Sequence, residues 1–218
     1  MKVLAFNGSP RKSWNTATLL KNALEGAEAI GAETELIHLY DLNFKGCKSC
    51  FACKMIGGKS YGRCAVQDDL QEIFTKVEEA DALVFGSPIY LGRVSGEMAA
   101  FLDRLVFQYL EYGPKQTLFP KKMQSGFIYT MNITEEQMKQ SGLESHFAFN
   151  TRILERTFGP TELLTSCNTY QFADYAKVVS SSWNVPEKTK QREEVFPLDC
   201  KKAFELGARL AAASHVSE

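Results

Sequence analysis

The 218-residue sequence has no long apolar run and no excess of charge of one sign. No stretch approaches the roughly 20 apolar residues that a membrane-spanning helix needs. The longest early apolar run, 3–6, is far too short for the core of a secretory signal peptide. A formal net charge of -1 offers no electrostatic attraction to nucleic acid or to an anionic membrane. We therefore expect a cytoplasmic protein that binds neither a membrane nor nucleic acid.

Histidine is scarce, and the cysteines are not arranged as in a secreted protein. The three histidines, His38, His146 and His215, do not stand at metal-ligand spacing, so none is assigned a catalytic role. Six cysteines without an export signal do not indicate a secreted disulfide framework. A reducing compartment suits them better, and there a cluster of thiols indicates metal ligands or redox groups.

Short apolar runs typical of buried strands alternate with segments of helical periodicity. Continuous apolar strands of this kind are typical of a parallel sheet covered by helices on both faces. With right-handed crossovers, the pattern predicts an α/β fold with a doubly wound, five-stranded parallel sheet. The expected strands are 2–6, 34–39, 82–86, 126–131 and 163–170, and the expected helices have apolar faces within 19–30, 70–77, 98–109, 143–158 and 199–213.

No repeat, low-complexity tract or linker divides the sequence, so we expect residues 1–218 to form a single domain. Within it we expect a Cys-rich loop at about 46–66 and two irregular stretches, 132–142 and 171–197. Loops of that length are more often functional or interfacial than idle. The aromatic composition of 170–183 suits a lid over a ligand or a dimer contact.

A polar loop, 8–16, follows the first expected strand and leads into a helix. Ligands of an open doubly wound sheet bind beyond the carboxyl ends of the strands, where this loop lies. The loop contains no G-x-G-x-x-G and no G-K-[ST] follows it, so it is neither a dinucleotide fingerprint nor a P-loop. Its donors and the free N–H groups of the helix suit a phosphate monoester. The alternative is a polar turn with a Ser/Thr helix cap. The donors are Ser9, Arg11, Ser13, Asn15 and Thr16.

Two further loops lie at the same edge. The loop 86–95 combines proline, an aromatic residue and two glycines, which suits one side of a flat heteroaromatic ring. Taken alone, the loop fits a structural turn with a surface-packed tyrosine better. The segment 129–132 is the weakest of the three signals, because a methionine at a strand end is usually part of the core.

Three motifs together resemble the NAD(P)H-dependent FMN reductases of flavodoxin-like fold. They are G-S-P-R-K-x-x-N-T at 8–16, G-S-P-I-Y-x-G at 86–92 and F-L-D-R at 101–104. More narrowly, the sequence resembles the iron-sulfur flavoprotein branch of that family. The resemblance is dense over 1–108 and thin afterwards. Within the third motif, Asp103 and Arg104 are expected to form a structural ion pair that braces their helix.

The resemblance implies bound FMN and assigns a place to individual residues. Ser9, Arg11, Asn15 and Thr16 would hold the phosphate, with Lys12 at its rim. Pro88, Ile89, Tyr90, Leu91 and Gly92 would lie along the isoalloxazine. Met131 and Asn132 fall where the family has a third flavin-contacting loop, although they reproduce no motif of it.

The implied reaction is electron transfer through FMN. A nicotinamide, NADH or NADPH, would reduce the flavin, and a quinone, another flavin, a small oxidant or a protein would accept the electrons. Because FMN carries the chemistry, no general acid or base is required. The family also implies a homodimer or homotetramer. Two other functions remain open: a flavodoxin-like electron carrier, against which the near-neutral charge argues mildly, and a cysteine-based redox sensor.

Four cysteines stand close together in the sequence. Cys47, Cys50 and Cys53 have C-x-x-C-x-x-C spacing, the run with which ferredoxin-type [4Fe–4S] ligation begins. In iron-sulfur flavoproteins a fourth cysteine precedes an Asp-Asp pair, and Cys64 stands before Asp68-Asp69 here, after a longer, glycine-rich gap. A structural zinc site and unmetallated thiols are the alternatives.

Overall fold

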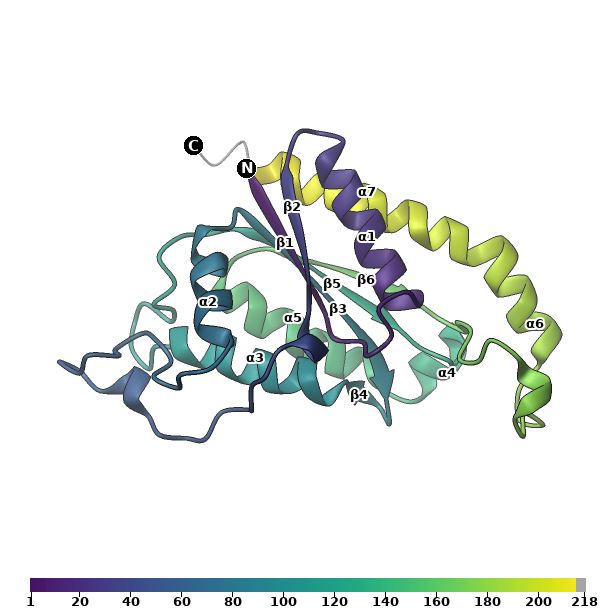
Figure 1. The fold of residues 1–218 in the computed structure, drawn as a ribbon, viewed down its shortest axis with the longest axis horizontal. Helices are drawn as coiled ribbons and strands as arrows, with labels where there is room; N and C mark the ends of the chain where they lie inside the picture. Colours follow the sequence, from purple (N-terminus) through teal and green to yellow (C-terminus); the bar gives the residue numbers. More distant parts are fainter. Residues whose placement is uncertain (215–218) are drawn as a thin grey trace.

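The computed structural model describes residues 1–214, so His215 lies outside the described residues. Five parallel strands form one sheet in the order β2-β1-β3-β5-β6 (Figure 1). This is the flavodoxin-like order, in which the winding reverses between β1 and β3. The predicted fold is therefore confirmed. The strands are β1 (Lys2–Asn7), β2 (Glu33–His38), β3 (Ala82–Tyr90), β5 (Gln124–Thr130) and β6 (Thr161–Ser166).

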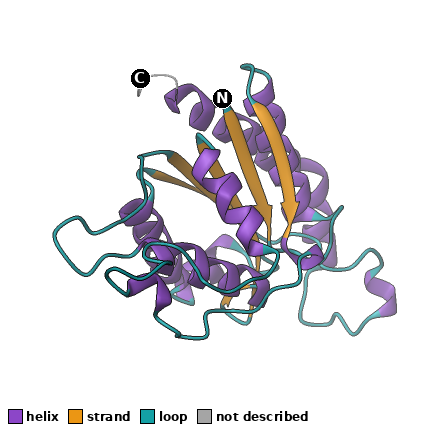
Figure 2. Ribbon diagram, turned by 60° about the vertical axis from the view of Figure 1, so that its left-hand side comes forward, coloured by secondary structure: helices purple, strands orange, loops and turns teal. Residues whose placement is uncertain are grey.

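Helices cover both faces of the sheet (Figures 1 and 2). Alternate residues of one strand serve two separate cores, as the two-residue period of a strand requires. In β1, Val3 and Ala5 pack with one core and Leu4 and Phe6 with the other. On the first face lie α1 (Asn15–Glu28) and α7 (Phe196–Ser214), and on the second lie α2 (Leu70–Glu79), α3 (Gly96–Tyr109) and α5 (Leu143–Thr157). Within residues 1–214, no helix combines the length and apolar character needed to cross a bilayer.

Helices α1 and α7 approach each other through two glycines. A Cβ placed on Gly26 would lie 1.9 Å from the carbonyl oxygen of Phe204, and one on Gly207 would lie 1.7 Å from the carbonyl oxygen of Ala23. Real Cβ atoms do not come this close to backbone atoms, so any larger residue would push the helices apart. The two glycines therefore set how closely and in what register α1 and α7 pack.

Serine and aspartate side chains stand at the starts of two helices. Ser95 caps α3, since its hydroxyl accepts a hydrogen bond from the Met98 N–H at 3.2 Å. For α2, Asp69 occupies the cap position, but its carboxylate accepts from the N–H of Asn43 instead of from the helix. The neighbouring Asp68 serves the helix start instead: its Oδ1 accepts a hydrogen bond from the N–H of Leu70, the first residue of α2, at 3.2 Å.

The predicted last strand, 163–170, extends too far. β6 ends at Ser166, and Asn168 adopts a left-handed conformation with φ of 53° that interrupts the ladder. The backbone then turns back onto β5, with the Thr169 N–H donating to the Met131 carbonyl at 3.0 Å. Residues 167–172 are consequently a loop at the carboxyl edge of the sheet.

Both stretches predicted to be irregular contain helix. The first holds α4 (Glu135–Gln140), which begins with a capping box formed by Thr134 and Gln137. The second is helical from Val185: α6 (Val185–Lys190) continues through a π-helical turn, Gln191–Val195, into α7. The start signal is Asn184 as cap with Pro186 in the first turn, which favours a helix despite the proline.

Candidate functional site

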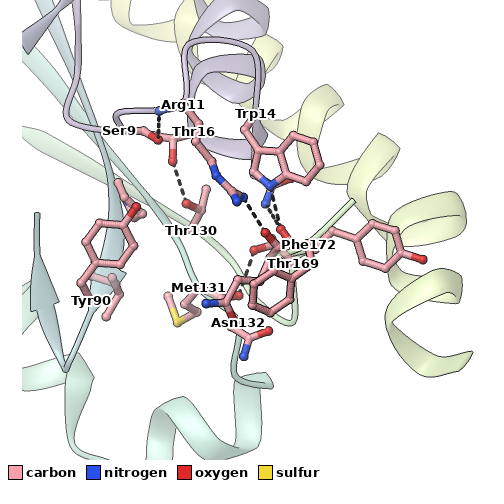
Figure 3. A pocket seen from close by; sticks show the side chains of 15 residues that line it. Ser9, Arg11, Trp14, Thr16, Tyr90, Thr130, Met131, Asn132, Thr169 and Phe172 are labelled. Atoms are coloured by element: carbon pink, nitrogen blue, oxygen red, sulfur yellow. Dashed lines mark hydrogen bonds between the residues drawn. The ribbon is translucent and has the colours of Figure 1, made fainter. Parts of the chain in front are cut away.

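The three predicted loops meet on one cavity of about 210 Å³ at the carboxyl edge of the sheet (Figure 3). In Figure 3, Tyr90 stands on one side, Trp14 and Phe172 on the other, and Met131 and Asn132 between them. The cavity lies beyond β1 and β3, the point at which the strand order reverses. The predicted site residues that line it are Ser9, Arg11, Asn15, Thr16, Pro88, Ile89, Tyr90, Met131 and Asn132.

A buried asparagine, Asn7, fixes the backbone of the loop after β1 through hydrogen bonds. The Asn7 amide donates to the Ser9 carbonyl at 3.2 Å, and the Ser9 N–H donates back to Asn7 Oδ1 at 3.0 Å. Asn7 also donates to His38 Nδ1 at 2.8 Å. Burial lowers the pKa of His38, which favours the neutral ring that can accept this bond. His38 thus supports the loop through Asn7.

The N-terminus of α1 faces the cavity without a cap. The cap position is Trp14, and within residues 1–214 no side chain accepts from the first helical N–H groups there. The alternative reading of this loop, a Ser/Thr-capped polar turn, is therefore not what the chain forms. Uncapped N–H groups and the positive end of the helix dipole make such a terminus an anion site.

A segment that no motif indicated, Tyr170–Phe172, closes the cavity. Its carbonyl groups accept from side chains of the loop after β1: Trp14 Nε1 to Tyr170 O is 2.8 Å and Asn15 Nδ2 to Tyr170 O is 2.7 Å. Arg11 donates to the Gln171 carbonyl at 2.5 Å. The first residues of the predicted lid segment therefore lie directly against the predicted phosphate loop.

Arg192 is a second guanidinium at this loop and was also missed. It lies on the π-helical turn, donates to Asn15 Oδ1 at 3.1 Å, and stands over the Trp14 ring at 5.9 Å. Arg11 stands over the same ring at 5.0 Å. Because the Asn15 oxygen accepts from Arg192, the NH₂ group of Asn15 is the donor to the Tyr170 carbonyl. Arg192 and Asn15 are 177 positions apart, so no local sequence pattern could have predicted their hydrogen bond.

The loop predicted to face a flat ring, 86–95, is a tight hairpin. β3 runs on to Tyr90 and pairs antiparallel with β4 (Arg93–Val94). The two turn residues, Leu91 and Gly92, both have positive φ, 49° and 82°, as in the type I′ turns that suit two-residue hairpins. Leu91 is 98% exposed, so it projects from the tip of the hairpin.

A second cavity, of about 390 Å³, shares a wall with the first. Both are lined by Ile89, Met131 and Asn132, and the predicted residues Leu91 and Gly92 line only the second. His146 lies on its far side, where burial lowers the pKa of the ring. Of the predicted flavin-site residues, Lys12 lines neither cavity and forms an ion pair with Asp41.

The four clustered cysteines surround one small cavity of about 20 Å³, at the end of the molecule away from α6. Cys53 is buried, Cys64 is half-buried, and Cys47 and Cys50 are exposed. Burial raises the pKa of the Cys53 thiol, and the neighbouring Lys54 opposes that shift. Within residues 1–214, no three metal-binding side chains stand at the geometry of a single-ion site. The glycine-rich gap loops outward without separating Cys64 from the other three.

Arg104 joins helix α3 to both ends of the Cys segment. It donates to the Lys45 carbonyl at 3.1 Å, to Asp68 Oδ1 at 3.0 Å and to Cys64 Sγ at 3.4 Å. Its Nε–H is buried and has no partner within the described residues. Asp103, by contrast, is exposed. An ion pair does brace the helix as expected, but Arg104 forms it with Asp68 instead of with its sequence neighbour.

The fold and the site together define a flavodoxin-like α/β protein with a cavity and an uncapped helix N-terminus at the switch point of its sheet. Residues 1–148 match the family model described as NADPH-dependent FMN reductase. The chain therefore belongs to the NADPH-dependent FMN reductase family, as its motifs predicted.

Curated relatives include several iron-sulfur flavoproteins. One from Archaeoglobus fulgidus is 43% identical over 104 residues, which are 48% of this chain and 48% of that protein. Another, from Methanocaldococcus jannaschii, is 40% identical over 104 residues, 48% of this chain and 51% of that protein. The chain spans about half the length of these relatives. The predicted resemblance to iron-sulfur flavoproteins is confirmed.

Solved structures share the fold at low identity. An NAD(P)H:quinone oxidoreductase from Methanothermobacter marburgensis has a TM-score of 0.71 at 17% identity, covering 96% of each chain. An azoreductase from Bacillus anthracis has a TM-score of 0.66 at 13% identity, covering 96% of this chain and 99% of its own. Likeness at this level of identity concerns the fold alone.

Proposed function

We propose that this protein is an FMN-dependent oxidoreductase that takes electrons from NADH or NADPH and passes them to a quinone, another flavin, a small oxidant or a protein. The observation that carries the proposal is the meeting of three loops, predicted separately from the sequence, on one cavity at the switch point. Membership of the FMN reductase family supports the choice of FMN among phosphate-bearing ligands.

The chain offers FMN a suitable set of contacts. Ser9, Arg11, Asn15 and Thr16 and the uncapped α1 terminus would hold the phosphate, since two guanidinium groups and open N–H groups favour an anion there. The β3–β4 hairpin and the loop at 131–132 would form the walls of the ring site. When bound, FMN supplies the redox chemistry, and the protein supplies anchoring and a fixed environment.

The second cavity favours an enzyme over an electron carrier. A carrier needs only an exposed flavin edge, whereas an enzyme needs space for a substrate against the ring. The cavity of about 390 Å³ shares three residues with the first one and falls within the size range of ligand pockets. We propose that it receives the nicotinamide or the electron acceptor.

We further propose that Cys47, Cys50, Cys53 and Cys64 bind a [4Fe–4S] cluster. All four thiols line one cavity together with a buried guanidinium that has an unused N–H group. Such a cluster takes four thiolates and is tuned by hydrogen bonds to its sulfur atoms, so the donors present fit it. The names of the curated relatives point the same way. A cluster would pass electrons singly, which would divide the two-electron load of the flavin.

The cluster is tested by metal analysis after anaerobic reconstitution with iron and sulfide. We expect about four irons per chain by the stoichiometry of such clusters, and a loss of iron in Cys50→Ala. Cys200→Ala, an isolated thiol elsewhere, is the matched control. Iron and sulfide unchanged in Cys50→Ala would remove that residue as a ligand, and bound zinc would favour the structural alternative.

Reduction of the FMN-loaded protein tests the oxidoreductase. We expect NADH or NADPH to reduce it faster than either reduces free FMN. Equal rates would refute the reductase function and favour a flavodoxin-like carrier.

We also propose that these 218 residues form one FMN-binding domain of a cytoplasmic homodimer or homotetramer. Light scattering of the purified protein measures the oligomer.

The phosphate assignment has its own test. Arg11→Ala should weaken FMN binding by about 1.5–3 kcal/mol, which is roughly 10- to 150-fold in Kd. Riboflavin, which lacks the phosphate, should lose little. Arg209→Ala removes a distant surface guanidinium paired with Glu162 and serves as the control. Equal losses for FMN and riboflavin would place Arg11 elsewhere than at the phosphate.

A further inference from the structure

The third flavin-side loop rests on a buried lysine, Lys188 of α6. This residue is 2% exposed. Its ammonium donates to the Asn132 carbonyl at 2.8 Å and to Asn168 Oδ1 at 2.8 Å. One of these groups belongs to the loop that lines both cavities, and the other to the left-handed residue that ends β6.

Within residues 1–214, no carboxylate pairs with this ammonium, and the two groups that accept its hydrogen bonds are neutral amide oxygens. Burial of an unpaired charge costs several kcal/mol, and buried charges in proteins are normally paired. Burial accordingly lowers the pKa of Lys188 to about 8, a value at which most of the side chain is still protonated at neutral pH. A buried cation without a carboxylate partner, held against a residue that lines both cavities, is typical of a functional site.

A second, independent feature lies beside it. Asn132 Oδ1 is buried and has no hydrogen-bond partner within the described residues. Unmatched buried polar atoms are uncommon in proteins and point to a partner that the protein itself does not supply. Asn132 lines both cavities and lies next to Met131 at the lower end of the site in Figure 3. Asn132 therefore connects the two features: its carbonyl accepts from the Lys188 ammonium, and its own side-chain oxygen is the acceptor without a partner.

We propose that Lys188 is a positioning and charge-compensating residue of the flavin site, holding the Asn132 loop and offsetting the negative charge that reduction places on the flavin. The inference rests on the proposed function. A hydride from the nicotinamide brings two electrons and one proton, so neutral FMN ring plus NAD(P)H becomes a ring with one net negative charge plus NAD(P)⁺. A fixed buried cation favours that charge in a low-dielectric site.

Lys188 lies outside the part of the chain that matches the family model, which ends at residue 148. Lys188 lies on α6, the helix that follows the aromatic segment 170–183, and α6 and the Cys-rich loop lie at opposite ends of the molecule (Figure 1). Redox tuning by this residue would thus be a property of this chain and would not depend on the cysteine site.

The test compares Lys188→Met and Lys188→Gln with Lys190→Met, an exposed lysine on the same helix. The readout is the two-electron midpoint potential of bound FMN, measured by titration against a reference dye. Without the charge, we expect the preference for reduced over oxidised flavin to fall at least tenfold, which lowers the potential by about 30 mV or more. Lys190→Met should leave the potential unchanged.

A structural role would give a different pattern. It predicts an unchanged potential in Lys188→Gln, which keeps a hydrogen-bond donor, together with a lower melting temperature of the FMN-free protein in both variants. Our inference predicts a lower potential in both variants, because both lack the charge, whatever the change in melting temperature. An unchanged potential, or failure of both variants to fold, overturns it. Failure of the wild-type protein to bind FMN would instead refute the proposed function.

Discussion

Replacement of Asp68 by asparagine is the sharpest test of how the Cys segment is held. The Arg104 side chain is 1% exposed and the Asp68 side chain 15% exposed. Asp68→Asn keeps the shape and one acceptor oxygen but removes the charge, so the guanidinium remains buried without a counterion. Breaking a buried pair in this way costs about 3–5 kcal/mol. Because Asp68 retains some contact with water, we expect a loss near the lower end, about 3 kcal/mol.

The assay is urea unfolding of the thiol-reduced, cofactor-free protein. A loss of this size is a large share of the roughly 5–15 kcal/mol that stabilises a typical domain. Asp103→Asn, one residue before Arg104 and exposed, is the matched control and should change stability by no more than about 0.5 kcal/mol.

The double variant Asp68→Asn/Arg104→Met decides whether the charge is responsible. With both charges gone and an apolar chain in place of the guanidinium, part of the stability should return, as in other buried pairs replaced by apolar residues. The reasoning is refuted if Asp68→Asn costs less than about 1 kcal/mol, or if the double variant is as unstable as the sum of the single ones.

Two further predictions concern the other face of the molecule. Gly207→Ala should destabilise the protein by about 3 kcal/mol in urea unfolding, because the added Cβ meets the Ala23 backbone. Gly96→Ala, which has open space around it, is the control and should be neutral or stabilising. An unchanged stability of Gly207→Ala would contradict the close contact between the helices. The stability of the wild type relative to Lys188→Met should rise by about 3 kcal/mol between pH 8 and 10.5, since the unfolded chain keeps the lysine proton up to its ordinary pKa of 10.5 while the native state releases it above about 8. A flat difference between the two proteins over that range would mean that Lys188 is not desolvated.

Most of the fold and half of the candidate site could be predicted because both are encoded locally. Apolar runs such as 82–86 mark buried strands, and right-handed crossovers leave few topologies for alternating strands and helices. The phosphate loop and the ring loop each directly follow a strand, so the carboxyl-edge rule assigns them to one place. Their meeting on one cavity needed no knowledge of any side-chain contact.

The rest of the site depends on residues that meet only after folding. Tyr170 and Gln171 bind the phosphate loop through backbone carbonyls, which carry no side-chain signature. Arg192 and Lys188 stand on helical turns where a charged residue ordinarily faces water, and only tertiary packing turns them inward. The helix start at Asn184 and Pro186 could have been recognised from the sequence, but the direction of Lys188 could not.

The close approach of α1 and α7 at Gly26 and Gly207 has a consequence for the number of residues that the chain can carry between Arg192 and Gly207. Helix α1 begins at the phosphate loop, and α7 continues from the turn that carries Arg192, so the glycine contact fixes both helices in one register. One residue more or fewer between Arg192 and Gly207 would rotate Arg192 by about 100° around the helix axis and away from Asn15. We therefore expect this helical segment to tolerate substitution far better than insertion or deletion, although most of it lies outside the cavity at the sheet edge.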